Sequence, residues 1–339
     1  MERSLIPPRK ILIIRPDRLG DLILSFPVAR TLKANFPSCE IIYLISPYNL
    51  GLATMVDYVD GWMLDFIDEN RKRSSRKLSM EMKSGSFDCL IELKPSWRTA
   101  VAGFLSGVKM RIGTSRRLYS VFYNHRISIH RKSSGFHQTD LELKHLEPFG
   151  ISEYAMNPIL HVADKGLDEA RKLLDTVDGP YIVIHPGSGG SAPNWPMKHY
   201  RRLAVLIKEN LDLEVVITDR NPLIPGFENC VKLGGKTDLI SLAGIISGAR
   251  AFISGSTGPL HMADALGTRC LSFFSNRSDI GPARWGPRRN IGYVLTSPDV
   301  CRCLDLENCH CLEQVSPEDA LAKLKTLLNE NISAEVNRN

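Results

Sequence analysis

The chain has 339 residues, of which 43% are hydrophobic and 24% are charged, and its net charge is +6. This length suits two domains of roughly 150 to 170 residues, and the composition excludes a chain that is disordered throughout. No apolar run approaches the ~20 residues of a membrane-spanning helix, and the first apolar run is too short for a signal peptide. We therefore expect a cytoplasmic protein.

Positive charge is concentrated in the first half of the chain. Residues 1–150 contain 23 Lys and Arg against 15 Asp and Glu, whereas the remainder contains 20 against 22. This asymmetry favours an anionic partner for the first half, such as a phosphorylated acceptor or a membrane surface. A solvated basic surface is the alternative. Aromatic residues make up only 7% and suggest no stacking platform, so we expect no nucleic-acid partner.

In the first half, apolar runs alternate with helical patterns. The expected strands are 10–15, 40–45, 87–93 and 109–113. The expected helices are 19–36, 71–84 and 97–106. Pro27 is expected to kink the first of these helices. Strands that alternate with helices predict a parallel sheet that is covered on both faces.

The second half repeats this plan. Its expected strands are 181–185, 214–218, 251–254 and 270–274, and its helices are 196–209, 238–248 and one after 258. We predict an α/β protein with two Rossmann-like, doubly wound domains, whose boundary falls in 164–179. The predicted parts are 1–165, 180–315 and a closing helix in 316–330. Such sheets bind ligands at the carboxyl ends of their strands, so we expect a cleft between the domains.

The first candidate motif follows the first strand and reads Arg15-Pro16-Asp17-Arg18-Leu19-Gly20-Asp21. Gly20 allows the backbone to approach a ligand or the other domain closely, and Asp21 is expected to point into the cleft. Arg15 and Arg18 supply cationic donors for an acceptor or a phosphate. Helix capping is the structural alternative for Asp21, because the helix dipole favours Asp in a first turn.

A glycine-rich turn follows the first strand of the second half and reads His185-Pro186-Gly187-Ser188-Gly189-Gly190-Ser191. Successive backbone N–H groups near a helix start can bind a diphosphate. The turn matches neither the dinucleotide fingerprint nor the P-loop, so these two nucleotide sites are not indicated. A purely structural loop is the alternative.

The third motif also joins a strand to a helix and reads Ser254-Gly255-Ser256-Thr257-Gly258-Pro259-Leu260-His261. Thr257 and the Gly258 amide are neutral hydrogen-bond donors, and Pro259 suits a first helical turn. His261 falls within that turn and is a candidate to face the cleft. A structural histidine is the alternative for His261.

The eight cysteines fall into two groups. Four are scattered singly, as expected of reduced core thiols: Cys39, Cys89, Cys230 and Cys270. The other four, Cys301, Cys303, Cys309 and Cys311, form C-x-C-x5-C-x-C. These thiols are candidate ligands of a structural zinc ion, although C-x-C differs from the usual C-x2-C knuckle. Free or redox-active thiols are the alternative.

The three motifs occur together, in order and at comparable strand ends. The sequence also carries Asn194-Trp195-Pro196 after the glycine-rich turn, and Ala263, Ala265, Leu266 and Gly267 after the third motif. This combination closely resembles the lipopolysaccharide heptosyltransferases, which form glycosyltransferase family 9. The resemblance covers about residues 10–328.

The resemblance implies a GT-B fold, in which the N-terminal domain receives the acceptor and the C-terminal domain binds a nucleotide sugar, typically ADP-heptose. It implies an inverting transferase with Asp21 as general base. The implied donor-binding residues are Ser188, Gly189, Gly190, Ser256, Thr257, Gly258 and His261. Because neither Asp17 nor Asp219 sits in an Asp-x-Asp pair, we expect transfer without a metal. We expect an anionic lipid-linked acceptor and action at the cytoplasmic face of the inner membrane.

Two positions depart from the family pattern. Pro193 stands where many members carry Lys, and Ser256 stands where many carry Asp. Lys198, Arg18 and the stretch 284–289 are candidate sources of the missing positive charge. A different nucleotide-activated sugar and a non-catalytic nucleotide-sugar-binding protein are therefore alternatives. A sugar-nucleotide epimerase or dehydrogenase is disfavoured, because the dinucleotide fingerprint and a Tyr-x-x-x-Lys pair are lacking.

Overall fold

The computed structural model describes residues 7–68, 71–72, 74–129, 135–190, 192–303, 306 and 309–329. The chain divides into two compact units, Met1–Ile159 (the first unit) and Leu160–Asn339 (the second unit). Each unit contains one six-stranded sheet. All the strand pairs of both large sheets are parallel, so the predicted α/β class is confirmed.

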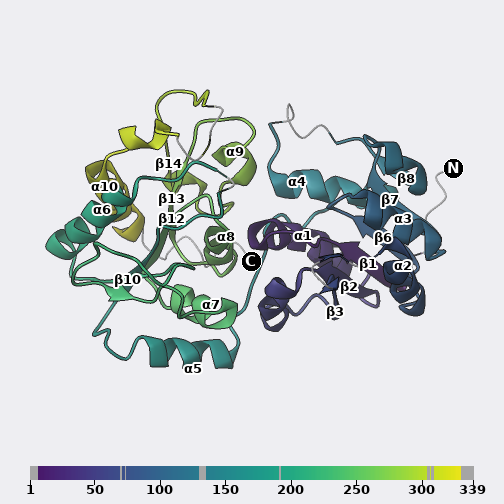
Figure 1. The fold of residues 1–339 in the computed structure, drawn as a ribbon, viewed down its shortest axis with the longest axis horizontal. Helices are drawn as coiled ribbons and strands as arrows, with labels where there is room; N and C mark the ends of the chain where they lie inside the picture. The colour runs from purple at the N-terminus through teal and green to yellow at the C-terminus, as the bar shows by residue number, and fades with distance from the viewer. Residues whose placement is uncertain are drawn as a thin grey trace. The chain divides into compact units, whose positions relative to one another are not determined.

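The sheet of the first unit has the strand order β3-β2-β1-β6-β7-β8 (Figure 1). Its strands are β1 (Lys10–Ile14), β2 (Glu40–Ile45), β3 (Gly61–Leu64), β6 (Cys89–Glu92), β7 (Met110–Thr114) and β8 (His125–Ile127). The chain winds outward from β1 in one direction and then, from β6, in the other. This is the doubly wound Rossmann order, whose direction reverses between β1 and β6.

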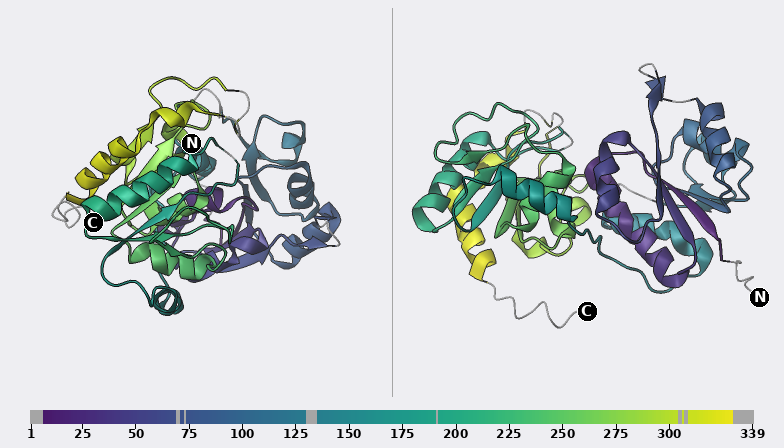
Figure 2. Two further views of the ribbon diagram at one scale, coloured as in Figure 1. Left: turned by 60° about the vertical axis from the view of Figure 1, so that its left-hand side comes forward. Right: turned by 90° about the horizontal axis from the view of Figure 1, so that it is seen from below.

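Helices cover both faces of this sheet (Figure 2). They are α1 (Leu19–Asn35), α2 (Ser75–Ser84), α3 (Trp97–Leu105) and α4 (Gln138–Leu143). Helix α1 packs on α4 and helix α2 packs on α3. Leu12 and Ile14 of β1 share a core with Leu78 of α2, whereas Tyr43 of β2 meets Phe26 of α1 at 5.7 Å between ring centroids. Alternate residues of each strand thus serve opposite layers.

Helix α1 has 17 residues and contains Pro27 in its interior. One detail of the first unit differs from the sequence-based expectation. The helix expected at 71–84 begins at Ser75, because Ser74 Oγ accepts a hydrogen bond from the Lys77 N–H (3.2 Å) and caps it. Before it, β4 (Ile67–Asp68) pairs with β5 (Arg71–Lys72) as a short antiparallel ribbon. The remaining short helices are η1 (Pro47–Thr54), η2 (Leu118–Phe122) and η3 (Lys144–Phe149).

The second unit repeats this topology with the strand order β11-β10-β9-β12-β13-β14. Its strands are β9 (Tyr181–His185), β10 (Glu214–Ile217), β11 (Val231–Lys232), β12 (Ala251–Gly255), β13 (Cys270–Phe274) and β14 (Val294–Thr296). The winding direction reverses between β9 and β12, which are hydrogen-bonded neighbours. β9 and β12 therefore hold the places that β1 and β6 hold in the first unit.

Helices α6 (Met197–Asn210) and α10 (Pro317–Asn329) pack together against one face of the second sheet. Helices α5 (Asp164–Leu173), α7 (Leu239–Ser247) and α8 (Gly258–Ala265) form the other layer (Figure 1). The short helices are α9 (Pro282–Trp285), η4 (Ile291–Tyr293) and η5 (Cys311–Gln314). Among the described residues, none of the helices has the length and apolar character needed to cross a bilayer.

The segment 164–179, in which the sequence predicts the domain boundary, begins with helix α5. This helix packs tightly on α7. At Gly166, an added Cβ would lie 2.8 Å from the carbonyl oxygen of Ile240, so only glycine allows this close approach. The division between the units falls earlier, at Ile159 and Leu160.

Candidate active site

The first motif lies where the strand order of the first sheet reverses. The loops that follow β1 and β6 meet there: Lys94 Nζ is 2.8 Å from Asp17 Oδ2, and Arg15 Nη1 donates to the carbonyl oxygen of Leu93 (3.1 Å). Doubly wound sheets bind their ligands at this reversal, outside the carboxyl ends of the strands. The motif thus occupies the ligand-binding position of the fold.

The buried side chain of Arg15 contacts the first turn of α1. Its side chain is 1% exposed, and its Nη2 atom lies 2.9 Å from Asp21 Oδ1 and 2.7 Å from Glu142 Oε1. Its Nε also donates to the Asp21 carbonyl oxygen (3.3 Å). Burial alone would lower the pKa of Arg15, but Glu142, Asp21 and Asp17 outweigh burial and raise the pKa above its ordinary value. Arg15 is therefore buried and orients the Asp21 carboxylate.

Glu142 is a member of this network that the sequence analysis missed. It lies on α4, far along the chain from the motif, and is 1% exposed. Gln138 Nε2, one turn earlier on the same helix, donates to Glu142 Oε1 (2.8 Å). The only local signal is an acidic residue between Leu141 and Leu143 in an apolar stretch. Such a residue must be paired when it is buried.

Among the three carboxylates around Arg15, Asp21 is the most exposed to solvent. Its side chain is 22% exposed, against 13% for Asp17. Asp21 lies in the first turn of α1, but the N-cap residue is Arg18, whose side chain makes no capping bond. The carboxylate of Asp21 is instead oriented by Arg15. Arg18 itself is exposed, and Gly20 is buried.

Asp17 is held as an anion. Burial opposes its charge, but hydrogen bonding to Lys94 and the nearby Arg15 guanidinium lower the pKa of Asp17 below its ordinary value. The loop after β1 thus presents two carboxylates, one paired with an exposed lysine and one with a buried arginine. A partly exposed, oriented carboxylate such as Asp21 can accept a proton from a bound hydroxyl.

The other two motifs meet at the reversal of the second sheet, between β9 and β12. Ser254 Oγ donates to the His185 carbonyl oxygen (3.0 Å) and lies 2.9 Å from Thr257 Oγ1. Ser254 is fully buried, so this link fixes the glycine-rich turn beside the start of α8. The structure therefore brings together the second and third motifs.

The glycine-rich turn is exposed, and its start at Pro186 is bonded to Asn194, which follows the turn. Ser188, Gly189 and Gly190 are exposed, and Gly190 has a φ of 70°, in the left-handed region that favours glycine. Downstream, Asn194 Nδ2 donates to the Pro186 carbonyl oxygen (2.5 Å). The turn is thus closed on itself by an asparagine of the motif Asn194-Trp195-Pro196.

Trp195 fixes this anchor in the core. Its ring stacks on Phe273 with 4.0 Å between ring centroids and 12° between planes. Its Nε1 atom donates to the carbonyl oxygen of Val315 (2.9 Å), which precedes α10. Trp195 is 1% exposed, so it supports the turn and does not present a surface to a ligand.

The start of α8 combines a cap with candidate ligand donors. Thr257 Oγ1 accepts from the Leu260 N–H (3.3 Å) and caps the helix. Ser256 and Gly258 are half-buried, whereas His261 is 5% exposed. His185 is also buried, with Nδ1 3.0 Å from Thr218 Oγ1. Burial lowers the pKa of His185 to about 4, so it is neutral at physiological pH.

The sequence matches a known protein family over most of its length. A family model described as "Glycosyltransferase family 9 (heptosyltransferase)" matches residues 75–320. The chain belongs to glycosyltransferase family 9. It is accordingly a glycosyltransferase, and the resemblance that the sequence motifs carry is confirmed.

Relatives of this family 9 enzyme share nearly its whole length. A Haemophilus influenzae protein, provisionally named a glycosyltransferase, is 26% identical over 338 residues, which cover 94% of this chain and 96% of that protein. The family 9 glycosyltransferase of Veillonella parvula matches with a TM-score of 0.81 and 19% identity, covering 98% and 99% of the two chains. Escherichia coli ADP-heptose LPS heptosyltransferase II matches with a TM-score of 0.76 and 20% identity, covering 94% and 98%. The GT-B fold is therefore confirmed.

The sequence-based candidates for the positive charge that Pro193 lacks are Lys198, Arg18 and the stretch 284–289. Lys198, in the first turn of α6, is exposed and lies 3.7 Å from Glu313. Arg288 and Arg289 lie elsewhere, because their backbone N–H groups donate to Asp264 of α8 (2.8 and 3.1 Å).

The Asp264 contact sets the position of the arginine stretch. Asn290 Oδ1 accepts from the N–H of Cys270, the first residue of β13 (3.0 Å). This contact places residues 288–290 near the amino end of β13. The glycine-rich turn follows the carboxyl end of β9, so the two lie at opposite ends of the parallel strands. Residues 288 and 289 are thus placed away from the glycine-rich turn, whereas Arg284 of the same stretch lies in α9.

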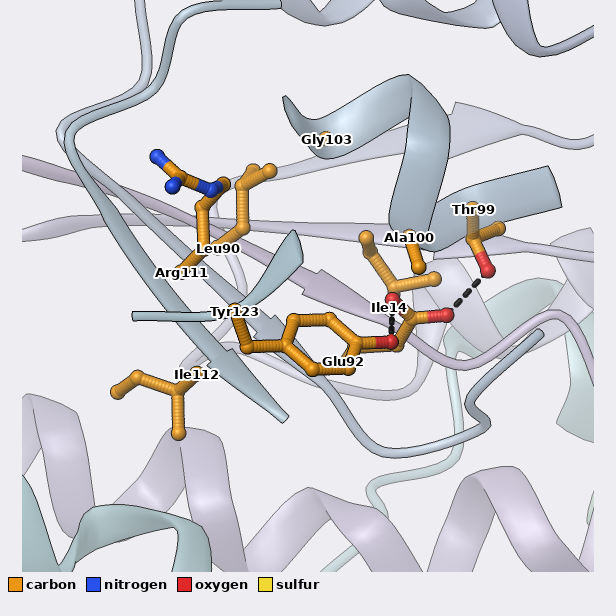
Figure 3. Close-up of a pocket in the computed structure, with 9 residues that line it drawn as sticks. All are labelled: Ile14, Leu90, Glu92, Thr99, Ala100, Gly103, Arg111, Ile112 and Tyr123. Atoms are coloured by element: carbon orange, nitrogen blue, oxygen red, sulfur yellow. Dashed lines mark hydrogen bonds between the residues drawn. The ribbon is translucent and has the colours of Figure 1, made fainter. Parts of the chain in front are cut away.

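A buried acid lies in a small cavity of the first unit (Figure 3). The cavity has a volume of about 10 Å³, which is too small for a sugar or a nucleotide. Glu92, the last residue of β6, accepts hydrogen bonds from the Thr99 hydroxyl and from the Tyr123 hydroxyl (2.7 Å). Burial raises the pKa of Glu92 to about 7. The cavity lining consists of Ile14, Leu90, Glu92, Thr99, Ala100, Gly103, Arg111, Ile112 and Tyr123.

We expect Glu92 to make folding stability depend on pH. The ordinary pKa of this acid is 4.5 and its folded value is about 7, so the folded state binds its proton more tightly. The resulting stabilisation is complete below pH 4.5 and is lost as the pH rises through about 7. The free energy of unfolding should fall by up to about 3 kcal/mol between about pH 5 and pH 8. Glu92→Gln should abolish this fall, as measured by urea unfolding.

The control for this prediction is Glu147→Gln, because Glu147 is an exposed acid of the same unit. The Glu147→Gln variant should keep the pH dependence of the parent protein. A Glu92→Gln variant whose unfolding free energy still declined with pH as in the parent would show that another group is responsible.

Proposed function

We propose that this enzyme is an inverting transferase that moves heptose from ADP-heptose onto a lipopolysaccharide core or a related lipid-linked acceptor. The observation that carries the proposal is the Ser254 link, which joins the exposed glycine-rich turn to the start of α8 at the reversal of the second sheet. The E. coli structural neighbour, whose name specifies ADP-heptose and LPS, supports this donor and acceptor class.

We assign donor binding to the second unit. The diphosphate accepts hydrogen bonds from the amides of Ser188, Gly189 and Gly190 and lies near the positive end of the α8 dipole. Thr257, Gly258, Ser256 and His261 then contact the phosphate and the sugar. As the sugar leaves, negative charge develops on the diphosphate, and a preorganised donor of this kind contributes about 3 kcal/mol to the transition state.

We assign the acceptor and the base to the first unit. The acceptor hydroxyl gives its proton to Asp21 while its oxygen attacks the anomeric carbon from the face opposite the nucleotide. The new C–O bond forms as the bond to the diphosphate breaks, so ADP leaves and the configuration inverts. Arg15 keeps the carboxylate in place, and the exposed Arg18 is available to the acceptor, whereas Gly20 is buried. The chemistry requires no metal.

The donor assignment is tested by calorimetric titration and by transfer assays. ADP-heptose is expected to bind more tightly than ADP-glucose or UDP-glucose and to be transferred to deacylated lipopolysaccharide core. Preferred transfer from another nucleotide sugar would shift the assignment to a different donor, which the Pro193 and Ser256 departures make the second candidate. Tight binding without transfer to any glycan acceptor would favour a nucleotide-sugar-binding protein.

We also propose that the first unit docks on the cytoplasmic leaflet of the inner membrane. Exposed apolar side chains gather where α3 packs on η2: Trp97, Phe104, Leu105, Leu118 and Val121. Exposed basic side chains occur in the same stretch of sequence: Lys109, Arg116, Arg117 and Arg126. Exposed apolar and basic side chains in one region suit the headgroup region of an anionic membrane. The sequence also contains a basic run, Arg71, Lys72, Arg73, Arg76 and Lys77, which is a further candidate to attract the anionic leaflet. Arg73 of this run lies outside the described residues.

Docking on the membrane predicts a specific binding defect. Leu118 and Val121 are 92% and 64% exposed, so the double variant Leu118→Asp/Val121→Asp should fold normally and lose most binding to anionic vesicles. The control is Leu223→Asp, which changes an equally exposed leucine of the second unit (79%). Vesicle sedimentation measures the effect, and equal binding by both variants would contradict the proposed surface.

A further inference from the structure

The four cysteines that follow β14 gather into one cluster. The sulfur atoms of Cys301, Cys303 and Cys309 lie within 4.8 Å of one another. Cys309 Sγ is 3.3 Å from Cys301 Sγ and 3.2 Å from Cys311 Sγ. Cys309 therefore connects all four thiols, although Cys311 belongs to η5 and the others precede it.

The cluster has nearly the dimensions of a tetrathiolate metal site. Zinc–sulfur bonds of about 2.3 Å in a tetrahedron place neighbouring sulfur atoms about 3.8 Å apart. The Cys309 sulfur lies closer than this to the sulfurs of Cys301 (3.3 Å) and Cys311 (3.2 Å). Cys311 stands outside the group of sulfur atoms that all lie within 4.8 Å of one another, so its side chain must move to complete a four-coordinate site. Cys301 and Cys309 are 6% and 9% exposed, and Cys303 and Cys311 are half-buried. Four ligands with low exposure are typical of a closed structural site.

The surroundings suit ionised sulfur. Ser275 follows β13, is buried, and its hydroxyl lies beside the Cys301 thiol, to which it can donate a hydrogen bond. A metal-bound thiolate would accept that hydrogen bond. Arg277 Nη1 donates to the Cys303 carbonyl oxygen (2.8 Å), so a cation lies next to the cluster. The same guanidinium also forms two hydrogen bonds to the Asp279 carboxylate (2.9 and 2.8 Å), so its charge is shared with that acid.

We propose that Cys301, Cys303, Cys309 and Cys311 bind one zinc ion. Each thiol gives its proton to solvent and forms one sulfur–zinc bond, and neither sulfur nor zinc changes its oxidation state. Thiolate ligands favour zinc over oxygen-preferring ions such as magnesium. The ion fixes the segment between β14 and α10 to the loop after β13 through Arg277. This role is structural and independent of the donor that the enzyme uses.

The test is elemental analysis of the full chain, purified without chelators or added metal. One zinc per chain is expected, together with eight titratable thiols after denaturation with a chelator, since the chain has eight cysteines. Cys301→Ser and Cys309→Ser should each weaken zinc binding by at least about 100-fold, more than loss of an outer partner typically does. Cys230→Ser is the matched control, because Cys230 lies outside the cluster, and it should keep the zinc.

A second measurement covers the case in which a variant does not fold. Cobalt(II) exchanged into the unmodified chain should give the strong thiolate-to-cobalt absorption and the visible bands of a tetrahedral site. A protein that holds no metal and shows no cobalt spectrum would overturn the proposal. Six titratable thiols in place of eight would show a disulfide instead, and one equivalent of iron would overturn the assignment to zinc.

Discussion

Asp21→Asn is expected to lower the transfer rate about 10²- to 10⁴-fold, the usual contribution of a general base. Asparagine keeps the size of the side chain and an oxygen that accepts from Arg15 Nη2, now 2.9 Å away, so the loop should stay in place. Donor affinity should be unchanged, because we assign donor binding to the second unit. Steady-state transfer kinetics and calorimetric donor titration measure the two quantities separately.

Asp17→Asn is the matched control for this experiment. Asp17 lies in the same loop and is also partly exposed, but it is paired with Lys94. Its substitution should reduce the rate much less than substitution of Asp21. A near-normal rate in Asp21→Asn would remove Asp21 from the role of base, and a selective loss in Asp17→Asn would transfer that role to Asp17.

Arg15→Met is expected to lower the free energy of unfolding by about 3–5 kcal/mol, because it leaves a buried carboxylate without its counter-ion. That carboxylate is Glu142, which is 1% exposed and 2.7 Å from the Arg15 guanidinium. Methionine matches the length of the arginine stem, so loss of charge dominates the change. Urea unfolding of the full chain, followed by the fluorescence of its four tryptophans, two in each unit, measures the effect.

Two further variants identify the cause of that loss. Arg18→Met changes an exposed arginine three residues away and should shift the unfolding free energy by no more than about 0.5 kcal/mol. Adding Glu142→Leu to Arg15→Met removes the unpaired carboxylate and should restore part of the lost stability. If Arg15→Met were as mild as Arg18→Met, or if the second substitution restored nothing, the buried ion pair would not be a major source of stability.

The sequence alone predicted the doubly wound fold and the placement of the three motifs at strand ends. Apolar runs such as Ile11–Ile14 are buried on both faces of the sheet. A parallel strand of this kind is recognisable in the sequence as a continuous apolar run. The turns that follow them stand out because glycine and proline interrupt the pattern. The edge strands β3, β8, β11 and β14 were not predicted, because they are short and only partly buried. They therefore lack the continuous apolar run that marks the equally short but buried strands β6 and β10.

The partners of the motif residues could not be predicted from local sequence. Glu142 reaches Arg15 only through the packing of α4 on α1, and Asp264 reaches residues 288–290 only through the crossover from β13 to β14. In both cases a buried carboxylate meets donors that are distant in the sequence. Periodicity identifies the helix on which such a residue lies, but the partner depends on tertiary packing.

The bond from Trp195 to Val315 links the segment before α10 to the region that supports the glycine-rich turn. A shortened protein that stopped before Val315 would leave a buried indole N–H without its acceptor, at a cost of about 1–3 kcal/mol. The neighbouring Asn194, which closes the glycine-rich turn, would lose its rigid support at the same time. C-terminal deletions in this enzyme should therefore impair nucleotide capture even if no deleted side chain touches the nucleotide.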